Sequence, residues 1–361
     1  MKILNKKEID YITIGASILA SGGGGDPYIG NLMALQALEK CGPIQLISVD
    51  ELHKDAFIIS IGMIGAPTVM IEKIPRGDEA IAACRLIENI LGKKISAIYP
   101  IEAGGINSLL PLTTATHLGI PVVDVDGMGR AFPEFQMTTF YVEDINASPF
   151  VVTDEKSNTV LIQATDSYTT ERLARSVCAK MGGSACFAGY AVTAEVAKKS
   201  GILDILSFEY KIGQTVEWAQ NNKLSVVKVL LDLLNGFTLF QGKIIKIDRK
   251  VDGGFVHGMV SFDGIEADRR QSFTISFQNE YLLAQSKDKI LCTTPDLIIV
   301  LDIETGMPIL TERLRYGLRV VVIGVPAHKK WRTKRGIEVV GPRYFKYDVD
   351  FVPVEALLTI K

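Results

Sequence analysis

The sequence predicts an α/β protein, with an N-terminal, mainly parallel sheet covered by helices and a C-terminal domain that is first helical and then β-rich. In the first half, apolar runs at 44–49, 57–61 and 96–101 alternate with segments of helical spacing, which is typical of a covered parallel sheet. From residue 237 onward, short apolar runs are separated by Asp-Gly, Thr-Gly and Pro, which indicates strands joined by turns. The change in pattern predicts two domains, 1–167 and 168–361, the second helical to about 236.

The remaining elements are predicted from spacing and from residues that begin or end helices. Helices are expected at 8–20, 28–40, 77–91, 108–118, 169–180, 208–220 and 224–234. Further strands are expected at 120–125, 136–142, 150–153, 159–164, 244–247, 255–262, 272–277, 297–301 and 320–325. The apolar segment 186–196 fits either a strand or a helix.

The region 99–134 is the expected active site. It forms a strand–helix–strand unit, and each strand runs into acid and glycine, as Glu102–Asn107 and as Asp124–Arg130. A third strand end, at 62–67, is also rich in glycine. Because the carboxyl ends of parallel strands share one edge of a sheet, we expect the three ends to converge where α/β proteins bind ligands.

Four carboxylates gather at these strand ends and are the predicted catalytic residues: Glu102, Asp124, Asp126 and Glu134. Acids held together away from water raise one another's pKa or attract a cation, which suits acid/base chemistry or metal binding. Arg130 lies among them as a partner or as a fork for a substrate carboxylate. The alternative interpretation is structural, with the acids capping helices and Arg130 forming a salt bridge.

The glycine run Gly22–Gly25 has three interpretations. Glycine-rich loops bind phosphates when they join a strand to a helix, but here the preceding segment is helical, and neither a GxGxxG pattern nor a Walker lysine is present. The run is otherwise a flexible connection between helices, or a loop that covers the site. We favour the last interpretation, in which Gly24, Gly25 and Asp26 contact a ligand.

Residues 292–317 hold a second set of polar side chains. Asp296 and Arg315 are predicted to reach a ligand from the second domain, and an interdomain salt bridge is the alternative for Arg315. Cys292 precedes an apolar run and would act as a nucleophile only beside a base, so we favour a buried structural cysteine.

Composition excludes several classes of protein. The 361 residues are 47% hydrophobic and 22% charged with a net charge of −2, and they contain no Lys/Arg-rich block, so nucleic acid and membranes are not expected partners. We expect no signal peptide, and no apolar run approaches the ~20 residues of a transmembrane helix. Five dispersed cysteines without a CxxC pair indicate reduced thiols and a cytoplasmic protein.

Metal binding has weaker support. The histidines are scattered, with no HExxH and no pair at zinc spacing. We predict no cofactor, although a carboxylate-rich site is compatible with a divalent cation. The sequence does not identify which residues would coordinate this cation.

Motifs spread along the chain carry a family resemblance. They are GGGGDPYIG at 22–30, EAGGIN at 102–107, PVVD at 121–124, DGMGRAFPE at 126–134, PDLI at 295–298, ETG at 304–306 and LRYG at 314–317. In this order they resemble the DUF917 proteins, which are associated with S-methyl thiohydantoin desulfurase and linked with hydantoinase/oxoprolinase-type enzymes.

The resemblance implies a hydrolase acting on a thiohydantoin-like ring, in which water displaces a thiol and leaves a hydantoin. Under it, Asp124 or Asp126 is the base, Glu102 or Glu134 holds a ring N–H, and Arg130 binds a carboxylate or stabilises negative charge. Substrate contacts are also expected from Gly104, Gly105 and Asn107. We expect a small-molecule substrate and a homo-oligomer.

Two further hypotheses stay open. In the first, the chain is a non-catalytic ligand-binding or partner subunit of a hydantoinase-type complex. In the second, it is a nucleotide-binding enzyme that uses Gly22–Gly25.

Overall fold

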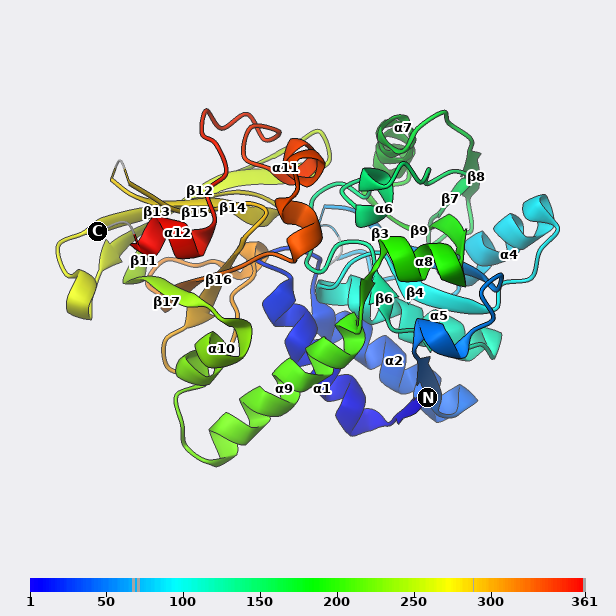
Figure 1. The fold of residues 1–361 in the computed structure, drawn as a ribbon, viewed down its shortest axis with the longest axis horizontal. Helices are drawn as coiled ribbons and strands as arrows, with labels where there is room; N and C mark the ends of the chain where they lie inside the picture. Colours follow the sequence, from blue (N-terminus) through cyan, green and yellow to red (C-terminus); the bar gives the residue numbers. More distant parts are fainter. Residues whose placement is uncertain (67–68, 70–71, 288, 360–361) are drawn as a thin grey trace.

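The computed structural model describes residues 1–361 except 67–68, 70–71, 288 and 360–361 (Figure 1). The predicted fold class is confirmed. We call the first sheet with its helices the N-terminal lobe, and the second sheet the β-rich lobe; Figure 1 shows them side by side, with α1 and α9 running below. Across the part of the chain just defined, no helix has the length and apolar character needed to cross a membrane.

The N-terminal lobe is built on an eight-stranded sheet whose centre is parallel. In spatial order its strands are β1 (Lys2–Leu4), β2 (Ile44–Ile47), β5 (Val122–Val123), β4 (Ala97–Pro100), β3 (Phe57–Gly65), β9 (Ser184–Thr193), β7 (Phe150–Thr153) and β8 (Thr159–Ile162). From β2 to β3 the neighbours are parallel, and the outer pairs are antiparallel. Because β9 follows the predicted boundary at 167/168, this sheet draws strands from both sides of that boundary.

Helices cover both faces of this sheet. The covering helices are α1 (Lys6–Leu19), α2 (Pro27–Cys41), α4 (Glu79–Leu91), α5 (Leu110–Leu118), α6 (Thr139–Val142), α7 (Ser167–Lys180), α8 (Ala194–Ser200), α9 (Ile205–Asn221) and α11 (Lys334–Val340). Two further helices, α10 (Val226–Leu234) and α12 (Val354–Thr359), contact the β-rich lobe. Apolar side chains of α1, α2, α4, α5 and α9 share one core with the sheet, and those of α6, α7, α8 and α11 share another. Gly15 lets α1 approach α9 closely, since a Cβ there would lie 2.1 Å from the carbonyl oxygen of Glu209.

The β-rich lobe is one antiparallel sheet. Its spatial order is β15 (Lys289–Thr293), β14 (Glu280–Ser286), β13 (Ser272–Gln278), β12 (Phe255–Gly264), β11 (Phe237–Asp252), β17 (Arg319–Val325) and β16 (Leu297–Asp302). Its core contains stacked aromatic rings, such as Phe240 and Phe273 with centroids 4.6 Å apart. The short strands β6 (Val125–Asp126) and β10 (Ile202–Leu203) pair separately. Short 3₁₀ turns are η1 (Val49–Glu51), η2 (Gly105–Ser108), η3 (Glu266–Asp268), η4 (Thr311–Arg313) and η5 (Lys329–Arg332).

One predicted strand is wrong. Residues 136–142 contain no strand and instead lead into α6, which begins after Thr138 because the Thr138 hydroxyl accepts the backbone N–H of Tyr141 at 3.1 Å. The ambiguous segment 186–196 is mainly β9, followed by the start of α8.

Candidate active site

A pocket lies where the two lobes meet. Three strand ends of the N-terminal lobe contribute to its wall: the end of β3, the segment after β4 and the loop after β6. The β-rich lobe adds the turn between β13 and β14. The lining residues are Gly24, Gly25, Met63, Ile64, Gly65, Ile101, Glu102, Asn107, Met128, Phe132, Pro133, Phe135, Arg175, Phe187, Asn279 and Glu280.

Glu102 is the predicted catalytic carboxylate that lines this pocket. Its Oε1 accepts the side-chain amide of Asn107 at 2.6 Å, and its Oε2 accepts the backbone N–H of Phe132 at 3.0 Å. Burial raises the pKa of Glu102 to about 7, although both hydrogen bonds and the charge of Arg130 favour its ionised form. A carboxyl group that titrates near neutrality is suited to proton transfer.

Asn107 ties Glu102 to the end of β3. Its Oδ1 accepts the backbone N–H of Met63 at 2.7 Å, while its amide group donates to Glu102. Both ends of this amide are therefore used, which fixes its orientation and that of the carboxylate.

Two glycine segments meet at the rim of the pocket. Gly105 has φ +58°, and a Cβ there would lie 2.1 Å from the carbonyl oxygen of Gly24. Ile106 donates its backbone N–H to that same oxygen at 3.0 Å. Gly104 helps to form this contact but, like Gly105, does not line the pocket itself. Contact of Gly24 and Gly25 with a ligand stays a prediction that their position supports.

Asp124 and Asp126 lie behind the pocket and hold the backbone. The Asp124 carboxylate accepts the N–H groups of Leu206 at 2.7 Å and Ser207 at 3.2 Å, and so caps α9. Asp126 Oδ2 accepts the N–H groups of Ala103 and Gly129, each at 2.7 Å. Neither carboxylate is among the groups that line the pocket, so both hold the loops that shape it.

Burial changes the protonation of the acids behind the pocket. It raises the pKa of Asp126 to about 8, and the nearby Glu102 adds to this effect. Glu209, on α9, accepts the Ser108 hydroxyl at 2.6 Å, and its pKa is raised well above the usual range by burial. Burial therefore favours the neutral form of both carboxyl groups.

Glu134 also lies outside the pocket lining. Its carboxylate accepts hydrogen bonds from Gln136 at 2.5 Å and from the Tyr344 hydroxyl at 2.7 Å. It joins the loop after β6 to the segment that follows α11.

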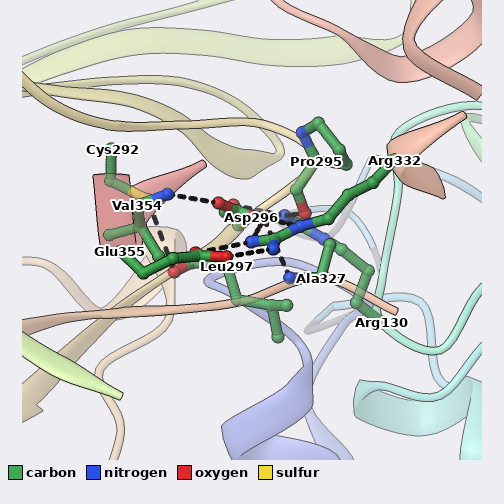
Figure 2. Close-up of polar contacts among 9 residues, drawn as sticks. All are labelled: Arg130, Cys292, Pro295, Asp296, Leu297, Ala327, Arg332, Val354 and Glu355. Atoms are coloured by element: carbon green, nitrogen blue, oxygen red, sulfur yellow. Dashed lines mark hydrogen bonds and ion pairs between the residues drawn. The ribbon is translucent and has the colours of Figure 1, made fainter. Parts of the chain in front are cut away.

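Arg130 and Asp296 meet in a buried network that joins the lobes (Figure 2). Arg130 Nη1 donates to the backbone carbonyls of Pro295 at 2.9 Å and Asp296 at 3.0 Å. The Asp296 carboxylate accepts the N–H groups of Ala327 and Val354, each at 2.8 Å, and an N–H of Arg332 at 2.7 Å. Neither residue lines the pocket, and the contacts of both hold backbone segments of the two lobes together. Substrate binding by Arg130 and Asp296 stays a prediction.

Asp26, Arg315 and Cys292 also lie away from the pocket lining. The Asp26 carboxylate caps α2 through the N–H of Tyr28 at 2.9 Å and forms an ion pair with Arg313. Arg315 is exposed. Cys292 is fully buried, and burial raises the pKa of its thiol well above the usual range, which agrees with the structural interpretation.

Sequence reasoning missed the groups that close the pocket from the other side. Asn279 and Glu280 lie in a hairpin turn, and Arg175 lies on α7, where its guanidinium packs 4.3 Å from the Phe255 ring centre. An Asn between two apolar runs predicts a turn. Only the tertiary structure shows that this turn faces Glu102.

The sequence neither predicted nor excluded a metal site. Among all residues outside the seven excluded positions, no three His, Cys, Asp or Glu side chains are grouped so that they could hold a metal ion.

Comparisons with known proteins cover nearly the whole chain. Residues 7–164 match a family model described as S-Me-THD-like, N-terminal domain, and residues 165–354 match one described as S-Me-THD-like, C-terminal domain. A crystal structure of a protein from Chromobacterium violaceum shares the fold, with a TM-score of 0.82 and 21% identity over 98% of this chain and 100% of that one. No curated protein matches the sequence significantly.

Proposed function

The chain belongs to the S-methyl thiohydantoin desulfurase-like (S-Me-THD-like) family, and from this premise we propose that it is a hydrolase in which water displaces a thiol from a thiohydantoin-like ring. The product is a hydantoin. The observation that carries the proposal is Glu102, a buried carboxyl group in the pocket wall with a pKa of about 7.

The pocket suits a small, flat, polar ring. Phe132, Phe135 and Phe187 supply apolar surface, whereas Glu102 and Asn107 supply polar groups near the strand ends. This division fits a ring with apolar faces and polar edges.

The proposed reaction needs a base for water. The Glu102 carboxylate takes a proton from water, whose oxygen bonds to the ring carbon that carries sulfur. The carbon–sulfur bond then breaks, the carbonyl forms, and the departing sulfur takes up a proton. Asn107 and the N–H of Phe132 hold the carboxylate in place during this step.

The test is thiol release from S-methyl thiohydantoins that differ in their ring substituent. We expect the purified protein to release methanethiol, detected in the gas phase so that the protein's own cysteines do not interfere. If a folded protein binds these compounds but releases no thiol, the hydrolase is rejected and the non-catalytic ligand-binding hypothesis is favoured.

A further inference from the structure

The turn between β13 and β14 places one carboxyl group of the β-rich lobe in the pocket. Glu280 is only 2% exposed and follows Asn279, whose backbone has φ +56°. The side-chain oxygen of Asn279 accepts the N–H of Val256 at 2.9 Å, and the backbone carbonyl of Asn279 accepts the Thr311 hydroxyl at 2.8 Å. These contacts hold the turn, and therefore Glu280, in a defined position.

The two oxygens of Glu280 have different surroundings. Oε1 accepts the backbone N–H of Gly24 at 3.1 Å. Oε2 is buried and has no hydrogen-bond partner within the described ranges of the chain. A buried polar atom without a partner is costly, and this one belongs to a residue that lines the pocket, so a ligand there can satisfy it.

We propose that Glu280 is the proton donor of this pocket, giving the proton on Oε2 to a ring nitrogen of the substrate while Glu102 deprotonates water. The assignment rests on the proposed function. It adds a catalytic residue, from the lobe opposite Glu102, to the reaction.

The contrast between the two acids supports these roles. Hydrogen-bond donors reach both oxygens of the Glu102 carboxylate, whereas the Gly24 N–H reaches only Oε1 of Glu280. Burial and the neighbouring Glu102 raise the pKa of Glu280 well above the usual range, with Arg130 opposing them. When the surroundings of two acids move their pKa values apart, the acid with the lower pKa acts as the base and the other as the proton donor. Here these are Glu102 and Glu280.

The proton balance closes over one turnover. Water loses a proton to Glu102 and bonds to the ring carbon, while the electron pair of the C=N bond moves to nitrogen, which takes the proton of Glu280. The new hydroxyl then returns a proton to Glu280 as the carbonyl forms and the C–N single bond is kept. The carbon–sulfur bond breaks, and the thiolate takes the proton held by Glu102, so both acids regain their starting states.

Glu280→Gln tests the proton donor, because glutamine keeps an oxygen for the Gly24 N–H but carries no acidic proton. We expect kcat to fall about 10²–10⁴-fold. Wild-type activity should decline at high pH as Glu280 ionises, and this decline should vanish in the variant. Glu304→Gln, an exposed carboxylate in the same lobe, is the matched control. A variant that keeps both its rate and the alkaline decline overturns the assignment.

Gly23→Ala tests the position of the carboxyl group without removing it. A Cβ at Gly23 would lie 1.9 Å from Glu280 Oε1, so the side chain must move. We expect a lower kcat, and no further loss when Gly23→Ala is added to Glu280→Gln. Fully additive losses would contradict a shared role.

Infrared spectroscopy separates this assignment from the choice of reaction. At pH 7 the difference spectrum of wild type minus Glu280→Gln should contain a protonated carboxyl C=O band, which separates Glu280 from the other buried acids. If the band is present but no thiol is released from any S-methyl thiohydantoin, the proposed reaction fails and Glu280 still stands as an acid in the pocket. If the band is absent, Glu280 is not the proton donor, whatever the reaction.

Discussion

The guanidinium of Arg130 donates to the backbone carbonyl of Asp296 at 3.0 Å, and so ties the loop after β6 to the β-rich lobe (Figure 2). The same side chain donates to Pro295 at 2.9 Å and to Ala131 at 3.0 Å. A buried cation held mainly by carbonyl oxygens fixes the position of two chain segments. One wall of the pocket therefore depends on a contact that lies outside it.

Arg130→Lys should destabilise the protein. An ammonium group cannot reproduce the planar fork, so several buried carbonyls lose their donor, at a cost of about 2–4 kcal/mol. Urea unfolding monitored by circular dichroism measures the loss. Arg343→Lys, whose guanidinium pairs with Asp348 and Asp350 at the surface, is the control and should change stability little. Equal effects in the two variants would argue against the role given to Arg130.

Activity should depend on the ionisation of Glu102. With a pKa of about 7, the base form grows as pH rises, so kcat/KM should increase through neutral pH. Glu102→Gln should lower kcat about 10²–10⁴-fold and remove this acid limb. The measurement is thiol release from pH 5 to 9, with Glu304→Gln as the surface control. An unchanged acid limb in Glu102→Gln would exclude Glu102 as the base.

Asp126→Asn should change how stability varies with pH. Because burial raises the pKa of Asp126 to about 8, the folded state keeps a proton that the unfolded state has lost, and wild-type stability falls as pH rises through this window. The variant lacks this dependence, so its stability relative to wild type should rise by about 1.4 kcal/mol per pH unit between roughly pH 5 and 7.

Urea unfolding at several pH values provides this comparison. Asp166→Asn is the matched control, since Asp166 caps α7 and its pKa is lowered by hydrogen bonds from Thr169. Its stability difference should stay flat over the same range. A flat difference for Asp126→Asn would show that Asp126 is ionised in the folded protein.

Gly105→Ala should disrupt the rim of the pocket. Both Gly105 and Gly119 have positive φ, +58° and +68°, so alanine at either site costs about 1–2 kcal/mol from the left-handed backbone. At Gly119 the added Cβ meets nothing within 4 Å, whereas at Gly105 it lies 2.1 Å from a carbonyl oxygen. Gly105→Ala should therefore cost about 1–3 kcal/mol more than Gly119→Ala, and it should also reduce thiol release.

The sequence alone predicted most of the elements, because their signals are local. The spacing of apolar residues, together with the residues that begin or end helices, located α1, α2 and α7. The alternation and the length of the apolar runs located β7 and β17. The sequence also predicted that Glu102 and Asn107 lie just after the end of a strand. The error at 136–142 has a local cause as well, since a β-like apolar run cannot show that the Thr138 hydroxyl caps a short helix.

Which acids face the pocket was decided only by the tertiary structure. Glu102 follows β4 and Asp126 is the last residue of β6, yet Glu102 lies in the pocket wall while Asp126 turns inward to bind backbone N–H groups. Glu280 is distant in sequence and reaches the pocket because the β-rich lobe packs its β13–β14 turn against Gly24. Local patterns determine the elements, but packing between lobes determines which side chains are left without a partner. That packing depends on contacts between residues more than 100 positions apart, which no local pattern specifies.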